Sequence, residues 1–72
     1  MPNDVCLKLG RQIRLLREKN QLTQEELASR ANISTKYLQN LEGKKPKVAS
    51  IVTLEKLAKG FNIPIWELLR IK

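Results

Sequence analysis

The sequence predicts an all-α fold, a compact five-helix bundle in which residues 1–72 form a single domain. Apolar residues recur at spacings of three and four along most of the chain, which is the period of an amphipathic helix. The alternation of apolar and polar residues that marks a strand does not appear. Residues that favour helix starts and ends stand between the apolar repeats, so the helices are short. A chain of this length buries a modest core, and a partner subunit would add stability.

The first helix is expected from about Asp4, a candidate N-cap, to Lys19, where Asn20 and Gln21 end it. One face of this segment carries the apolar side chains Val5, Leu9, Ile13 and Leu16. Three cations lie away from that face, namely Lys8, Arg11 and Arg14, and the two arginines are interpreted as ordinary solvated surface.

The second helix has a clearly specified start at Thr23. Glu26 follows three residues later, which is the spacing of a capping box, where each side chain bonds the backbone N–H of the other residue. Leu22 before the cap and Leu27 after it are placed as a hydrophobic staple.

The third helix is expected over residues 34–42, with Ser34 as its N-cap. Tyr37 stands where a capping box would have Glu, so a carboxylate is missing at the helix start that is expected to face a polyanion. Asn32 tolerates the positive φ of a tight turn between the second and third helices. Helices joined by so short a turn cross steeply, and residues 23–42 therefore predict a helix-turn-helix.

Two further helices complete the predicted bundle. Ser50 is the candidate N-cap of a fourth helix, and Asn62 can take the left-handed conformation that closes it. The apolar face of this helix carries Leu54, Leu57, Ala58 and Phe61. A final short helix follows Pro64, and residues 44–49 are predicted to form a charged loop.

The charge balance points to a polyanionic partner. Fourteen Lys and Arg against seven Asp and Glu give a net charge of +7, which on so small a body favours nucleic acid first and an anionic membrane surface second. No apolar run approaches the roughly 20 residues that cross a bilayer, and the N-terminus lacks the plan of a signal peptide. An intracellular, cytoplasmic protein is expected.

The residue types exclude much of enzyme chemistry. The single Cys6 cannot form an internal disulfide, and without His there is no Cys/His metal site and no Ser-His or Cys-His pair. Glu25 and Glu26 are adjacent and would point in different directions on a helix. The three glycines stand apart and make no phosphate-binding loop. We expect no enzyme, no metal and no cofactor.

The runs LTQEELASRANIS, YLQNLEGKK and TLEKLAKGFNIPIWELL resemble the Cro and phage-repressor (Xre) family of helix-turn-helix regulators over about residues 11–69. The core positions match the family as well as the motif does, at Leu27, Ala28, Ile33, Leu38, Leu41, Glu42, Leu54, Leu57, Ala58 and Leu68. Asn32 and Asn62 stand where the family commonly has Gly, a mild change because Asn also adopts the left-handed conformation. The loop over residues 43–49 is about one residue longer than the common form.

Carried over onto matching positions, the resemblance implies that residues 34–42 form a recognition helix in the major groove. The base-reading positions correspond to Thr35, Lys36 and Asn40, with Tyr37 and Gln39 beside them. Lys36 can donate to guanine O6 and N7, Asn40 can pair with adenine, and Thr35 can hydrogen-bond a base or offer its methyl to thymine.

The resemblance also implies contacts to the DNA backbone and one internal ion pair. Gln24 matches a phosphate-binding position at the start of the second helix, where exposed N–H groups also favour an anion. The far side of the groove would be held by three loop lysines, Lys44, Lys45 and Lys47. Arg17 should pair with Glu42 at the end of the recognition helix, which would explain an acid beside the DNA surface.

Plainer alternatives stay open. The polar residues of the third helix could be an ordinary solvated face, and the loop lysines could serve solubility alone. Tyr37 could pack its ring over the domain edge and touch phosphate only incidentally.

The C-terminal segment, residues 63–71, is predicted to make a homodimer, because its apolar residues exceed what one face of a short helix can bury. Trp66 falls where the family usually places a polar residue, and soluble monomers rarely leave such a patch bare. The patch would comprise Ile65, Trp66, Leu69 and Ile71. The alternative is that Trp66 folds back onto its own domain.

Taken together, these features predict a transcriptional regulator that binds double-stranded DNA sequence-specifically, as a homodimer on an inverted-repeat operator. Without a second domain no small-molecule effector is expected, which favours a repressor or an autoregulating controller whose occupancy follows its own concentration. One alternative is a protein-interaction module such as an antitoxin or adaptor. The other is the DNA-binding domain of a larger protein.

Overall fold

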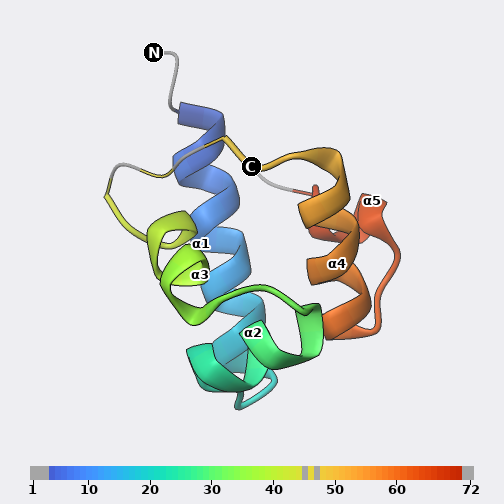
Figure 1. The fold of residues 1–72 in the computed structure, drawn as a ribbon. Coiled ribbons are helices and arrows are strands. Elements are labelled where there is room, and N and C mark those ends of the chain that lie inside the picture. The colour runs from blue at the N-terminus through green and yellow to red at the C-terminus, as the bar shows by residue number, and fades with distance from the viewer. Residues whose placement is uncertain (1–3, 45, 47, 71–72) are drawn as a thin grey trace.

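The structure, a computed structural model, describes residues 4–44, 46 and 48–70, apart from the side chain of Asp4. Within these ranges the helices are α1 (Asp4–Lys19), α2 (Gln24–Ala31), α3 (Thr35–Leu41), α4 (Ile51–Phe61) and α5 (Ile65–Leu68), as Figure 1 shows. No strand occurs among the described residues, so the predicted all-α fold and the order of its helices are confirmed. The predicted cap at Asp4 depends on a side chain outside the described residues.

A single core holds the bundle together. Every helix contributes one large apolar side chain that is fully buried, and these are Ile13, Leu27, Leu38, Leu57 and Leu68. α2 packs most extensively against α4. In the view of Figure 1, α1 runs along the side of the bundle opposite α4, and α5 packs against α4. Because each helix is short, its stability comes mainly from burying this face and not from propensity.

Three helices end in the same way, with a residue in the left-handed conformation just beyond the last turn. These residues are Gln21, Asn32 and Asn62, with φ of 58°, 57° and 59°. In each case the next N–H returns to a carbonyl five residues back, at 2.9 Å, from Leu22 to Arg17, from Ile33 to Ala28 and from Ile63 to Ala58. The structure thus confirms the predicted roles of both asparagines and the end of the first helix at Asn20 and Gln21, and it adds the left-handed conformation of Gln21, which was not predicted.

Gly10 is the point where α1 touches the end of α3. A β-carbon at this position would collide with the backbone carbonyl of Leu41. Glycine inside a helix costs about 1 kcal/mol relative to alanine, so this close approach gives the residue a structural reason. The contact fixes the C-terminal end of α3 against α1 and places Glu42 within reach of Arg17.

Across the described part of the chain, no helix combines the length and apolar character needed to cross a membrane.

Candidate nucleic-acid interface

The start of α2 is closed by the predicted capping box. The Glu26 N–H donates to Thr23 Oγ1 at 3.0 Å, and the Thr23 N–H donates to Glu26 Oε1 at 2.9 Å. The bond from the Thr23 backbone is the main reason that the pKa of Glu26 is lowered from its ordinary value of 4.5. The folded helix start therefore favours the charged carboxylate of Glu26 over the protonated acid.

At the start of α3, only one of the two bonds of a capping box is present. Ser34 Oγ accepts the Tyr37 N–H at 3.1 Å, and the first turn of α3 contains no acid. The N-terminal end of this helix therefore keeps its positive partial charge without a carboxylate to neutralise it.

The two faces of α3 differ as the helix-turn-helix prediction requires. Its inner face buries Leu38 and Leu41 in the core. Its outer face presents Lys36 and Gln39, which are exposed, with Thr35 and Asn40 half-buried beside them. A shallow groove of about 250 Å³ runs over this surface and is lined by Ser34, Lys36, Tyr37 and Asn40.

Tyr37 occupies the edge of this surface. Its ring is half-buried and packs against the core, and its hydroxyl lies 3.5 Å from Thr53 Oγ1 in α4. The ring therefore has the packing role that was one of the two alternatives. A contact between its hydroxyl and DNA stays a prediction.

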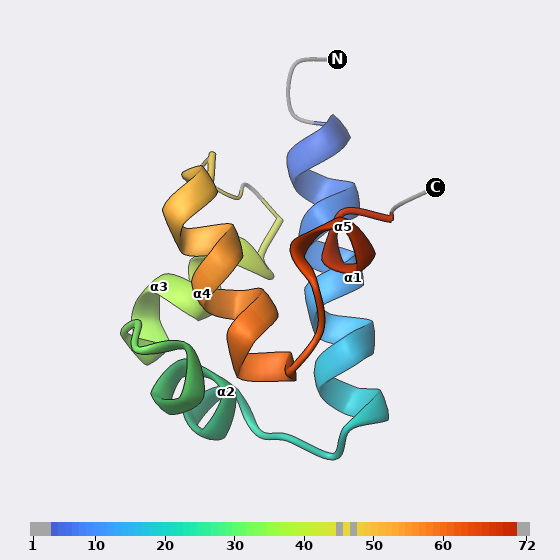
Figure 2. The same ribbon diagram turned by 90° about the vertical axis from the view of Figure 1, so that its right-hand side faces the viewer.

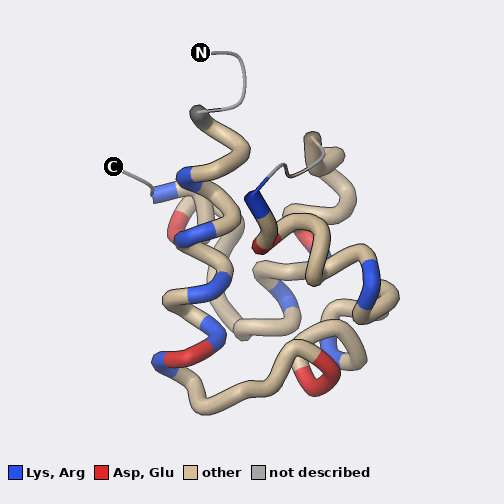
Figure 3. Tube along the Cα trace, turned by 90° about the vertical axis from the view of Figure 1, so that its left-hand side faces the viewer, with Lys and Arg blue, Asp and Glu red and all other residues tan. Residues whose placement is uncertain are grey.

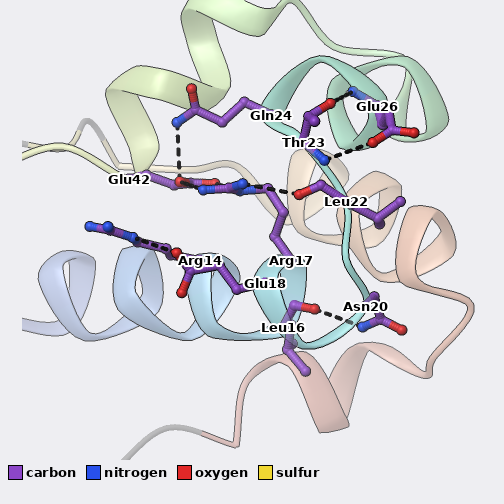
Figure 4. A network of polar contacts seen from close by, with 10 residues as sticks. All are labelled: Arg14, Leu16, Arg17, Glu18, Asn20, Leu22, Thr23, Gln24, Glu26 and Glu42. Atoms are coloured by element: carbon purple, nitrogen blue, oxygen red, sulfur yellow. Dashed lines mark hydrogen bonds and ion pairs between the residues drawn. The ribbon is translucent and has the colours of Figure 1, made fainter.

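Arg17 and Glu42 form a bidentate ion pair behind the outer face of α3 (Figure 4). Arg17 Nε donates to Glu42 Oε2 and Arg17 Nη2 donates to Glu42 Oε1, both at 3.0 Å. The third donor, Arg17 Nη1, bonds the Leu22 carbonyl at 3.0 Å. The two side chains are 13% and 4% exposed, so this is the pairing that the resemblance implies, in a mostly buried setting.

Gln24 joins this network, which the sequence analysis did not foresee. Its side-chain amide donates to Glu42 Oε1 at 3.2 Å. The first residue of α2 is thereby tied to the end of α3, and the amide still has a second N–H that can donate to a phosphate.

A groove of about 450 Å³ opens between α1, the start of α2 and the end of α3. It is lined by Arg14, Arg17, Thr23, Gln24, Gln39 and Glu42. Arg14 was interpreted from the sequence as ordinary solvated surface, yet it lies in this groove. Its position one helical turn before Arg17 is the signal that could have indicated it, since Arg17 was already expected beside Glu42.

Positive charge continues along α1 toward the loop after α3. Figure 3 shows Lys and Arg recurring through the length of α1, with the end of α3 next to it. Lys44 is exposed there. Lys45 and Lys47, the other two predicted backbone contacts, lie outside the described residues.

The C-terminal helix leaves apolar surface uncovered. Trp66 is 63% exposed and Leu69 is 40% exposed, so Trp66 is not folded into its own core. Ile65 is half-buried and packs on the core, while Ile71 lies outside the described residues. The structure adds a second exposed apolar group near the start of α4 that the sequence analysis missed, made of Val48, Ile51 and Val52.

The fold and the paired, capped helices α2 and α3 define this protein as a helix-turn-helix protein, and a family model described as a helix-turn-helix domain matches residues 10–72. The control protein C.MunI from a Mycoplasma species is 36% identical over 67 residues, which are 92% of this chain and 89% of that protein. The chain belongs to this family of helix-turn-helix control proteins, which is not a family of enzymes.

Solved structures of two other controllers have the same fold. The restriction-modification controller protein C.AhdI from Aeromonas hydrophila aligns with a TM-score of 0.82 and 32% identity, covering 88% of this chain and 94% of that one. C.Esp1396I bound to a 19 base pair DNA duplex aligns with a TM-score of 0.81 and 26% identity, covering 92% and 91%.

Proposed function

We propose that this chain is a transcriptional regulator that binds double-stranded DNA sequence-specifically and controls the expression of restriction-modification genes. The observation that carries the proposal is the outer face of α3, where polar and basic side chains surround a helix start that has no acid. Its similarity to controller proteins, one of which has been solved on a DNA duplex, supports the choice of ligand and of regulated genes.

In this proposal α3 enters the major groove and reads bases. Lys36 would donate to guanine O6 and N7, and Asn40 would pair with adenine N6 and N7. Thr35 and Gln39 flank them on the same exposed side. The buried network behind α3 holds the helix at a fixed angle, so that these side chains meet the base edges without a costly rearrangement.

Contacts to the DNA backbone set the register of α3. Gln24 lies on one flank of α3 and Lys44 lies in the loop that follows its C-terminal end. Contacts of this kind position a protein on DNA and carry no sequence information themselves.

Selection of bound duplexes from a random library would identify the operator. Lys36→Ala and Asn40→Ala should each relax the preference at particular base pairs, by about 1–3 kcal/mol per good contact. Lys44→Ala should weaken all duplexes alike and lower the dependence of affinity on salt. A Lys44→Ala protein with altered base preference, beside α3 variants with unchanged preference, would show that α3 is not the reading helix.

We infer that the protein works as a homodimer through the exposed apolar side chains of α5. Trp66 and Leu69 support this inference, and Figure 2 presents α4 and α5 on the same side of the molecule. A two-fold axis on that side would set two copies of α3 about 34 Å apart, which is one turn of DNA, on an inverted-repeat operator.

Trp66→Ala tests the dimer, since Trp66 is the only tryptophan and reports on its own surroundings. The wild-type emission should shift to the blue as protein concentration rises through the dimer dissociation constant. The variant should be folded, should be monomeric in sedimentation, and should bind the operator with lower affinity than the wild type does. If it stays dimeric, Ile51→Ser asks whether the apolar group at the start of α4 makes the interface instead of α5.

The protein-interaction module remains the second class of function. It would be favoured by a wild-type protein that shows no salt-dependent affinity for duplex DNA. A regulator of this kind acts where bacterial DNA is held, so we propose that it works in the cytoplasm.

A further inference from the structure

The groove of about 450 Å³ between α1, the start of α2 and the end of α3 contains two arginines that differ in their bonding. All three guanidinium nitrogens of Arg17 are bonded within the protein, because Nε and Nη2 donate to Glu42 and Nη1 donates to the Leu22 carbonyl. The charge of Arg17 is therefore balanced by Glu42 and its guanidinium is held in place. It forms a rigid floor to the groove.

Arg14 is bound far more loosely. Its one hydrogen bond within the described part of the chain runs from Nε to Glu18 Oε2, at 3.3 Å, and leaves the Nη groups to solvent. The two side chains are 62% and 53% exposed, and such surface pairs contribute little to stability. Arg14 can thus exchange Glu18 for another anion at small cost.

The geometry gathers these groups on one side of α1. Figure 4 shows the guanidinium of Arg14, the Arg17–Glu42 pair and the amide of Gln24 one above another, with the Nη groups of Arg14 directed away from Glu18. Gln39, on the exposed side of α3, borders the same groove. The groove therefore flanks the surface that is proposed to read bases.

We propose that one backbone phosphate of the bound duplex occupies this groove, held by the Nη groups of Arg14 and the amide nitrogen of Gln24. This inference rests on the proposed DNA binding and assigns it a residue that the sequence analysis left as solvated surface. A guanidinium offers two parallel N–H groups that match two phosphate oxygens, which makes arginine suited to this contact. Glu18 holds Arg14 in the free protein and returns to water when the phosphate replaces it.

The test compares Arg14→Gln with Lys59→Gln. Like Arg14, Lys59 forms an ion pair with an acid on the same helix, because its Nζ lies 3.9 Å from Oε1 of Glu55, four residues before it. Both side chains are exposed, and neither lines the groove. Each substitution removes one positive charge and one exposed ion pair. Affinity is measured as a function of salt concentration, on a duplex selected by the wild-type protein and on a scrambled duplex of the same length.

Arg14→Gln should lower the affinity for both duplexes by the same factor, about fivefold to tenfold at low salt, and reduce the slope of log affinity against log salt by about 0.9. Lys59→Gln should change the affinity less than twofold and leave the slope as it is. Equal effects of the two substitutions would overturn the proposal, because the lost contact would then be only a share of the general positive field.

A second pair of variants tests the role of Glu18. Glu18→Gln should strengthen binding more than Glu55→Gln does, because it also releases Arg14. Equal gains would contradict the exchange of partners. A wild-type protein that fails to bind duplex DNA would refute the proposed function, whereas normal wild-type binding with no special effect at Arg14 would refute only the phosphate site.

Discussion

The two helices of the helix-turn-helix begin with related caps that differ in charge. At the start of α2, Thr23 and Glu26 bond each other's backbone in a complete capping box. At the start of α3, Ser34 caps alone and Tyr37 takes the position where an acid would complete the box. The difference separates two tasks, because an acid at a helix start stabilises the helix but repels a polyanion placed there.

The two helices also depend on each other. The carboxylate of Glu42, at the end of α3, accepts bonds from Arg17 in α1 and from Gln24, the first residue of α2. The helix that lacks an acid at its start is thus held at its end by an acid that is mostly buried. The negative charge is present in the motif, but it is buried and paired with Arg17.

The largest effect is expected from breaking this link. Removing one partner of a mostly buried pair strands the other charge, so Arg17→Met and Glu42→Leu should each lower the free energy of unfolding by about 3–5 kcal/mol. The double variant should lose less than the sum, which denaturant melts at low temperature would measure. Additive losses would show that the two residues are not coupled.

The next effect sharpens the comparison of the two starts. Tyr37→Glu completes the capping box at α3 but places a carboxylate toward the DNA, and like charges there should cost several kcal/mol of binding, a loss of about a hundredfold or more. Tyr37→Gln is the matched control, because it loses the same ring packing and can still complete the box. Similar binding by the two variants would mean that charge at this helix start is unimportant.

How much could be predicted from the sequence depended on how local each feature was. The capping box at Thr23 and the left-handed Asn32 are confirmed because the interactions that form them lie within a few residues of each other. Gln21 was correctly placed at the end of the first helix, but its left-handed φ was not predicted, because this conformation goes against the preference of its residue type.

Features that depend on distant segments were the hardest to foresee. Gly10 appears isolated in the sequence, and only the approach of α3 gives it a reason. The lining of the groove by Arg14, and the bond from Gln24 to Glu42, depend on how α1, α2 and α3 cross. The sequence analysis gave no role to Val48, Ile51 and Val52, and their exposure depends on which face of α4 packs against the rest of the bundle.

A smaller effect concerns the turn that leads into α2. Gln21 has a φ of 58°, where a side chain is strained and glycine is not. Gln21→Gly should therefore raise the free energy of unfolding by about 0.5–1 kcal/mol, since relief of strain outweighs the added freedom of the unfolded chain. Asn62→Gly should raise the free energy of unfolding by less, because Asn tolerates this conformation. Thermal melts of both variants would show a reversed order if packing, and not strain, dominated.

The smallest effect is a difference in acid sensitivity between the two helix starts. The bond from the Thr23 backbone lowers the pKa of Glu26 below 4.5, so the folded state favours the carboxylate over the acid. This contribution is complete above the pKa that Glu26 has in the unfolded chain, and it is lost as pH falls through the lower value of the folded state. The start of α3 has no acid in its first turn and should not show such a loss. Amide hydrogen exchange between pH 5 and pH 3, a range that includes the ordinary pKa of 4.5 and extends below it, should show protection falling at the first turn of α2 relative to that of α3. Glu26→Gln should abolish the difference, because an amide can accept the Thr23 N–H at any pH. If the two helix starts lost protection together in the wild type, global unfolding would be the cause and the capping box would have no separate part in it.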